Sequence, residues 1–177
     1  YGMTETSPLL TCNPPAKLKP GSVGIPVVGT EIRIVCAENG DVEMAIGEPG
    51  EIIAKGPQVM KGYLNLPEAT KNAIKIFQDE KWLYTGDVAK MDEDGYITIC
   101  DRNKDMLIVG GFKVFSVEIE GKLKELPLVE LSAIIGTPDE KRPGNDVVNL
   151  YVQLSSGFKD DNHEEMKAVI LSFCKKN

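Results

Sequence analysis

The 177-residue chain has a single histidine, His163, and its four cysteines show neither a Cys-x-x-Cys pair nor another zinc-type spacing. One histidine cannot build a multi-histidine metal site, and it argues against a histidine-based catalytic triad. We expect the cysteines to be buried, reduced thiols of a cytosolic protein. His163 is assigned to the surface, in the first turn of the last helix, with no catalytic role.

Positive charge and long apolar runs are also scarce. The chain has 20 basic and 27 acidic residues, a net charge of -7. A nucleic-acid binder needs a basic face, so nucleic acid is not an expected partner. No apolar run approaches the roughly 18 residues of a membrane span, and no signal peptide is visible. The length suits one compact domain or two small ones.

The polarity pattern predicts an α+β fold. Residues 1–30 are rich in proline, glycine, threonine and serine, and they predict a loop. The turn residues Asp92–Gly95 favour a hairpin between two of the strands. Strands are expected at 31–36, 50–55, 82–90, 96–101, 106–109, 129–136 and 147–154. Helices are expected at 66–77, at 116–126 and after a capping Asn162, and we place a domain boundary at about 103–105.

Two short motifs carry groups that could bind a nucleotide. Tyr1–Glu5 (Tyr-Gly-Met-Thr-Glu) combines an aromatic ring that can stack on a purine with a glycine that permits close approach. Its carboxylate could face phosphates through a cation such as Mg²⁺. Tyr84–Asp87 (Tyr-Thr-Gly-Asp) offers, at an expected strand end, a carboxylate that can accept hydrogen bonds from two ribose hydroxyls. Taken alone, the first motif favours an exposed tail and the second a capped β-turn.

Two further segments are equally ambiguous in isolation. Asp101–Asp105 (Asp-Arg-Asn-Lys-Asp) is a charge cluster between apolar strands, which is typical of a solvated linker. The pair Gly110-Gly111 follows it, and such a pair most often marks a bend. Residues 160–165 are acidic and favour the solvated start of a helix.

In this order, however, the motifs and the segment 101–120 closely resemble the AMP-forming acyl-CoA synthetases of the adenylate-forming superfamily, with the strongest likeness to long-chain fatty acid–CoA ligases. Segments 21–26, 47–52 and 56–63 look like the same family. The resemblance is continuous to about residue 120 and weaker beyond. It implies that residues 1–103 are the β-rich end of the large AMP-binding domain, and that 104–177 are a truncated small, mobile α+β C-terminal domain.

The resemblance also implies roles for individual residues in nucleotide binding. Tyr1 would stack on the adenine and Gly2 would line the cofactor site. Thr4 would meet the α-phosphate, and Glu5 would hold Mg²⁺. Asp87 would bind both ribose hydroxyls.

The remaining implied roles concern the nucleotide's other end and the second reaction step. Arg102 would contact the ribose or a phosphate, and Lys104 would be the hinge between the two domains. Gly110 and Gly111 would line the channel for the pantetheine arm of coenzyme A.

The family chemistry has two steps. A fatty acid carboxylate attacks the α-phosphate of ATP, giving an acyl-adenylate and pyrophosphate. The coenzyme A thiol then forms the thioester and releases AMP. The implied enzyme is cytoplasmic, with peripheral membrane contact and oligomeric state left open.

The family's phosphate loop and its C-terminal lysine have no counterpart here, so we expect a C-terminal fragment that is inactive alone. Two alternatives remain. The acyl-adenylate could pass to a carrier-protein thiol, or the chain could be a non-catalytic structural fragment. The acyl chain length cannot be read from these residues.

Overall fold

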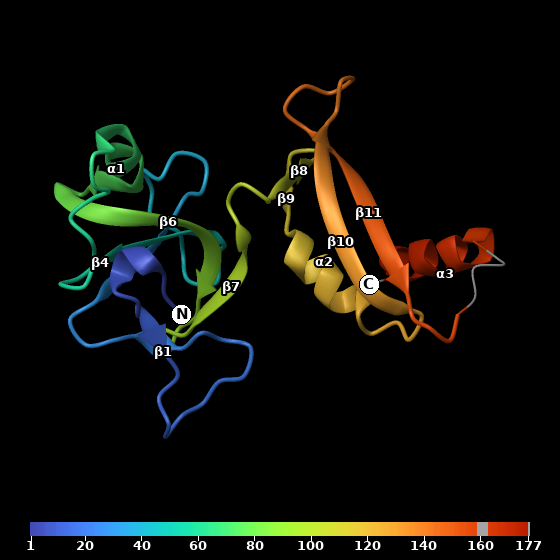
Figure 1. The fold of residues 1–177 in the computed structure, drawn as a ribbon, viewed down its shortest axis with the longest axis horizontal. Coiled ribbons are helices and arrows are strands. Elements are labelled where there is room, and N and C mark those ends of the chain that lie inside the picture. The colour runs from blue at the N-terminus through green and yellow to red at the C-terminus, as the bar shows by residue number, and fades with distance from the viewer. Residues whose placement is uncertain (159–162, 177) are drawn as a thin grey trace. The chain divides into compact units, whose positions relative to one another are not determined.

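The computed structural model describes residues 1–158 and 163–176. The chain divides into two compact units, Tyr1–Lys104 and Asp105–Asn177, which we describe separately (Figure 1). Both units contain strands and helices and the strands dominate, so the mixed, strand-rich character expected from the sequence is confirmed. The cap expected from Asn162 lies outside the described residues.

The first unit is built on an antiparallel sheet. Its strands are β3 (Glu31–Val35), β4 (Gly50–Lys55), β5 (Ile74–Phe77), β6 (Glu80–Met91) and β7 (Ile97–Arg102). The order is β3-β4-β6-β5, and β7 also pairs with β6, which runs through the unit as one long curved strand (Figure 1). A short 3₁₀ turn (η1, Thr4–Thr6) and the two-stranded pair β1 (Thr11–Cys12) and β2 (Ile25–Pro26) hold the N-terminal segment.

Strand β4 is buried on both faces. Ile52 and Ala54 belong to one apolar cluster, with Leu10 and Ile97, whereas Ile53 belongs to a second. Successive side chains of a strand point to opposite faces, so an uninterrupted apolar run places β4 between two layers of core. The strands expected at 31–36 and 50–55 are confirmed to within one residue.

The helix expected over 66–77 is only half present. Helix α1 (Pro67–Ala73) ends at Ala73, and Ile74–Phe77 forms β5 instead. The run Ile-Lys-Ile-Phe has β-branched residues in alternation, which favours a strand. Gln78 and Asp79, both with positive φ, turn this run back onto β6. Cross-strand pairing thus outweighs the helical spacing of the apolar residues.

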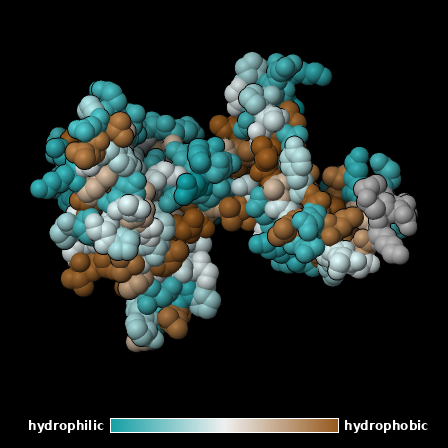
Figure 2. Space-filling model, viewed as in Figure 1, coloured by the Kyte–Doolittle hydropathy of each residue, from teal (hydrophilic) through white to brown (hydrophobic). Residues whose placement is uncertain are grey.

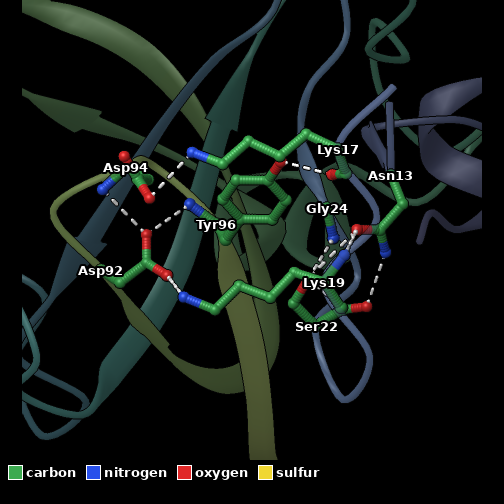
Figure 3. Close-up of polar contacts among 8 residues, drawn as sticks. All are labelled: Asn13, Lys17, Lys19, Ser22, Gly24, Asp92, Asp94 and Tyr96. Carbon is green, nitrogen blue, oxygen red and sulfur yellow. Dashed lines mark hydrogen bonds and ion pairs between the residues drawn. The ribbon is translucent and has the colours of Figure 1, made fainter. Parts of the chain in front are cut away.

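A clasp joins the loop of residues 13–24 to the β6–β7 turn (Figure 3). The Tyr96 hydroxyl donates to the Lys17 carbonyl at 2.6 Å, and the ammonium groups of Lys17 and Lys19 lie 5.8 and 5.5 Å from the Tyr96 ring centroid. Lys17 pairs with Asp94 and Lys19 with Asp92. The hydrogen bond from Lys19 holds the pKa of Asp92 below its usual value. The expected turn at 92–95 is therefore confirmed, and it anchors the loop.

The second unit contains two hairpins and two helices. These elements are β8 (Leu107–Val109), β9 (Phe112–Val114), α2 (Ser116–Leu123), β10 (Val129–Pro138), β11 (Asp146–Leu154) and α3 (His163–Lys176). Leu123 and Ile170 bring the two helices onto a core shared with Val129. Helix α2 ends three residues before the expected Leu126, because a turn with bonds to the third preceding carbonyl carries the chain to Pro127.

The expectation of buried cysteines is wrong. None of the four is in a disulfide bond within the described residues, but Cys12 and Cys174 are exposed, and Cys36 and Cys100 are partly exposed. Large side chains also remain exposed on both units, among them Leu64 and Tyr151. Hydrophobic residues form patches on the face drawn in Figure 2. No helix within the described residues is both long and apolar enough to cross a membrane.

Candidate functional site

The Tyr84–Asp87 motif lies inside β6 rather than at a strand end, which corrects the expectation. Ile53 pairs with Tyr84 and Glu51 with Val88, so three residues of β6 stand opposite one residue of β4. Gly86, at the centre of this bulge, has a φ of +75°. That backbone conformation strains any residue with a Cβ, and glycine adopts it freely. The bulge redirects the strand and places Asp87 beside β7.

Asp87 forms the centre of a polar cluster. Its side chain is 15% exposed, and its Oδ2 accepts a 2.5 Å hydrogen bond from the hydroxyl of Tyr1. The Nε of Arg102, the residue paired with Asp87 across β6 and β7, lies 3.5 Å from Oδ1. Burial and the bond to Asp87 raise the pKa of the Tyr1 phenol well above its usual value, so the phenol is a stable donor. The structure thus brings together Tyr1, Asp87 and Arg102, three residues singled out from the sequence.

A cavity of about 440 Å³ opens at this cluster. It is lined by Thr85, Gly86, Asp87, Arg102, Asn103 and Lys104. One carboxylate thus stands beside two cationic side chains at its wall. A carboxylate accepts hydrogen bonds from neighbouring hydroxyls, as a sugar diol offers them, and cations attract phosphate oxygens. The chemistry of this wall fits a phosphorylated sugar.

The N-terminal segment folds back on itself through the 3₁₀ turn that contains Glu5, and this brings Gly2 opposite Leu9. A Cβ on Gly2 would lie 1.8 Å from the carbonyl oxygen of Pro8, so this glycine is required by the chain's own close approach. Thr4 and Glu5 lie in the 3₁₀ turn, where Thr4 is exposed. The conformation of the motif therefore requires glycine at position 2, whether or not a ligand is present.

Glu5 contacts the segment of residues 56–63. Its Oε1 accepts a 2.7 Å hydrogen bond from the hydroxyl of Tyr63, and its carbonyl accepts one of 2.8 Å from the Met60 amide. The bond to Glu5 raises the pKa of the Tyr63 phenol. The described residues contain no cluster of three or more possible metal ligands. A single carboxylate such as that of Glu5 suits Mg²⁺ held largely by water and substrate phosphates.

Lys104, the expected hinge residue, and the pair Gly110-Gly111 belong to different units. Lys104 is exposed, is the last residue of the first unit and lines the cavity beside Asp87. Gly110 and Gly111 belong to the second unit, where they form the two-residue turn between β8 and β9 with φ values of +60° and +84°. Positive φ at both central residues is the signature of a type I′ hairpin turn. A Cβ on either glycine would meet nothing within 4 Å.

The sequence did not identify Glu51 and Asn103 as site residues. Their hydrogen bonds hold the backbone at Gly86, next to Asp87. Glu51 Oε1 accepts a 2.9 Å hydrogen bond from the Gly86 amide, and the Asn103 amide group donates to Glu51 Oε2 at 3.4 Å. The only available signal was a charged residue inside the apolar run of β4. The role of this charged residue can be recognised only once the bulge of β6 is known.

Known proteins similar in sequence agree with this interpretation of the site. Residues 1–64 match the family model of AMP-binding enzymes. The chain is 48% identical over 141 residues to a long-chain-fatty-acid–CoA ligase of Yersinia pestis, and this match covers 79% of the chain and 24% of the relative. It is 40% identical over its whole length to the same type of ligase from Salmonella typhimurium, of which it covers 29%. The chain thus spans about a quarter to a third of these relatives.

A solved structure agrees over the whole chain. The crystal structure of ATP-bound MatB from Rhodopseudomonas palustris is 37% identical and superposes with a TM-score of 0.86, covering 100% of this chain and 33% of that protein. The likeness includes both sequence and fold, and it extends across both units. The chain belongs to the AMP-binding, adenylate-forming enzymes, with long-chain-fatty-acid–CoA ligases among its relatives.

Proposed function

We propose that this chain forms part of an ATP-dependent long-chain fatty acid–CoA ligase, and that the cavity at Asp87 takes the ribose of the adenine nucleotide. The observation that carries the proposal is the Tyr1–Asp87–Arg102 cluster. It sets an oriented, largely buried carboxylate beside a cation at the wall of a cavity. Two ribose hydroxyls can donate to such a carboxylate.

In this proposal the first unit is the β-rich end of the nucleotide-binding domain. Asp87 accepts from the ribose hydroxyls, and Arg102 contacts the ribose or a phosphate. Tyr1 lies under the adenine, with its hydroxyl fixed by Asp87. Aromatic faces stack on purines, and a ring held by a short hydrogen bond loses little further freedom on binding.

Thr4 and Glu5 face the phosphate end of the nucleotide in the same proposal. One oxygen of the Glu5 carboxylate accepts a hydrogen bond from Tyr63, and the carboxylate has further lone pairs that can accept from a hydrated Mg²⁺. When bound, this ion would neutralise charge on the phosphates. Glu5 and Tyr63 orient that end of the site.

The second unit serves the thioester step. Lys104 is the hinge in this proposal, because it is the last residue before the boundary between the compact units. Gly110 and Gly111 line the path of the pantetheine arm, where their lack of side chains leaves room for a thin substrate. A hinge needs only a few backbone torsions to absorb a large rotation.

The test is a calorimetric titration of the 177-residue chain with AMP. We expect saturable binding, and a loss of affinity of at least ~10-fold in Asp87→Ala, because each hydrogen bond to a charged group contributes about 1.5–3 kcal/mol. Asp41→Ala, an exposed acidic residue on a turn, is the matched control and should bind as the wild type does. Equal affinities for Asp87→Ala and wild type would remove the ribose role.

A further inference from the structure

Glu51 is a carboxylate buried in the core of the first unit. Only 7% of the residue is exposed, and it lies on β4 between Gly50 and Ile52, both also buried. A buried ionised carboxylate loses much of its hydration free energy, so it persists only where hydrogen bonds compensate. The contacts of Glu51 show which part of the fold it holds.

Glu51 and Asn103 fix the peptide groups of Gly86 from both ends. The Gly86 N–H donates to Glu51 Oε1 at 2.9 Å, and the Gly86 carbonyl accepts from the backbone N–H of Asn103 at 2.8 Å. The Asn103 side-chain amide donates to Glu51 Oε2 at 3.4 Å and to the carbonyl of Ala37 at 2.9 Å. Gly86 is the residue of positive φ in the bulge, so these bonds determine the direction in which Asp87 leaves β6.

The charges around Glu51 come from several elements. Burial raises the pKa of Glu51, and the negative charge of Asp87 adds to this, whereas the Gly86 and Asn103 hydrogen bonds and the cation of Lys75 oppose it. The Lys75 ammonium lies 4.5 Å from the ring centroid of Tyr84, on the strand that carries the bulge. The balance of these effects still leaves the pKa above the ordinary value of a glutamate.

We propose that Glu51, assisted by Asn103, is a positioning residue that holds the Gly86–Asp87 bulge in the geometry that presents Asp87 to the ribose. The inference rests on the proposed function of the cavity and deepens it. Glu51 acts through the backbone of Gly86 and through Asn103, while Asp87 accepts the ribose hydroxyls.

The test compares two nucleotides. AMP carries the ribose diol, whereas 2′,3′-dideoxyadenosine monophosphate lacks it and cannot use Asp87 in this way. We expect Glu51→Ala and Asn103→Ala to weaken AMP binding by roughly 10-fold and 3-fold. Glu51→Ala, at a residue that does not line the cavity, should leave the affinity for the dideoxy nucleotide within about 2-fold of wild type. Glu48→Ala, an exposed glutamate on the loop before β4, is the matched control.

If Glu51→Ala weakens the binding of both nucleotides equally, or of neither, the positioning role is overturned, because a general loss of structure affects a nucleotide with or without the ribose diol. Glu51→Gln keeps an acceptor for the Gly86 amide but turns an NH₂ group toward Asn103. It should retain AMP affinity better than Glu51→Ala, and it guards against misfolding of the alanine variant.

A ligand-free measurement separates this inference from the proposed function. The ¹⁵N–¹H resonance of Gly86 should shift with pH at the titration of Glu51, above the ordinary range of glutamate, and the step should vanish in Glu51→Gln. A Gly86 resonance that ignores Glu51 would overturn the contact itself. If wild type binds no AMP, the ribose role and the positioning role both fail, while the Gly86 titration still reports whether Glu51 holds the bulge.

Discussion

Tyr1 and Asp87 are separated by 86 positions in the sequence, yet the Tyr1 hydroxyl donates a 2.5 Å hydrogen bond to Asp87 Oδ2. Main-chain bonds hold Tyr1 in place, since its terminal amine donates to the Thr11 carbonyl at 2.9 Å and its carbonyl accepts from Thr11 at 3.0 Å. The Thr11 hydroxyl, fully buried, donates to the Val23 carbonyl at 2.7 Å. The N-terminal segment is thus tied to the sheet at the position of the candidate site.

Removing the Tyr1 hydroxyl should destabilise the first unit. Tyr1→Phe loses a hydrogen bond to a charged acceptor in a half-buried position, so we expect the free energy of unfolding to fall by about 1–2 kcal/mol. Urea denaturation at neutral pH measures this change. A variant as stable as wild type would show that the bond contributes nothing in solution.

The Tyr1 phenol should ionise at a higher pH than an ordinary tyrosine does. Because the folded pKa of Tyr1 is raised, the bond's contribution is fully present below the unfolded pKa of about 10 and is lost as the pH rises through the folded pKa. Ultraviolet difference spectroscopy of the five tyrosines should show one phenol that ionises last. Tyr1→Phe should remove that step, and its persistence would contradict the assignment.

Two glycines with similar backbone conformations should respond differently to alanine. Gly24 and Gly21 have φ values of +89° and +84°. A Cβ on Gly24 would lie 2.1 Å from the carbonyl carbon of Cys12, whereas a Cβ on Gly21 would meet nothing within 4 Å. We expect Gly24→Ala to cost more than about 3 kcal/mol, as a steric clash with backbone, and Gly21→Ala about 1 kcal/mol of backbone strain. Thermal denaturation measures the loss of unfolding free energy in both variants. Equal losses would refute the close approach of Gly24 to the Cys12 carbonyl.

The clasp of Figure 3 should depend on a neutral hydrogen bond more than on charge. Tyr96→Phe removes the 2.6 Å bond to the Lys17 carbonyl and should lower stability by about 1 kcal/mol at any salt concentration. Lys19→Gln removes an exposed ion pair, so its smaller effect should vanish at high salt. Denaturation in low and high sodium chloride measures both. A salt-sensitive loss in Tyr96→Phe would point to the lysines instead.

The raised pKa of Glu51 sets the direction in which it changes the stability of the chain with pH. Its folded pKa is raised, so its favourable contribution is present below the unfolded pKa of about 4.3 and declines as the pH rises through the folded pKa. The stability of wild type relative to Glu51→Gln should therefore fall as the pH rises above about 4. Denaturation curves across this range test the sign, and a relative stability that rises with pH would contradict it.

Local patterns predicted the strands of this chain better than they predicted the site. The apolar run of β4 and the turn at Asp92–Gly95 are local signals, and both were correct. The expected helix over 66–77 failed in its second half because pairing with β6, a non-local interaction, selects a strand for Ile74–Phe77. The bulge at Gly86 also depends on register between strands, which no single segment encodes.

The residues of the candidate site likewise divide into those with a local sequence signal and those whose role depends on non-local contacts. Tyr1, Asp87 and Arg102 were identified from motifs, but their mutual contacts required the fold. Glu51 and Asn103 were missed because their function depends on the backbone of Gly86. The residues proposed to contact the nucleotide lie in short motifs, whereas the residues that hold those motifs in place are spread along the chain.

The most direct measurement uses the complete protein that contains these residues. ATP, Mg²⁺, coenzyme A and carboxylic acids from acetate to long-chain and aromatic acids would be supplied, with AMP and thioester followed by mass spectrometry, for wild type and Asp87→Ala. We predict AMP and thioester with long-chain acids, and a loss of at least ~10-fold in kcat/KM for ATP in Asp87→Ala. Acyl-adenylate without thioester, no AMP with any acid, or an unaffected Asp87→Ala enzyme would contradict the account.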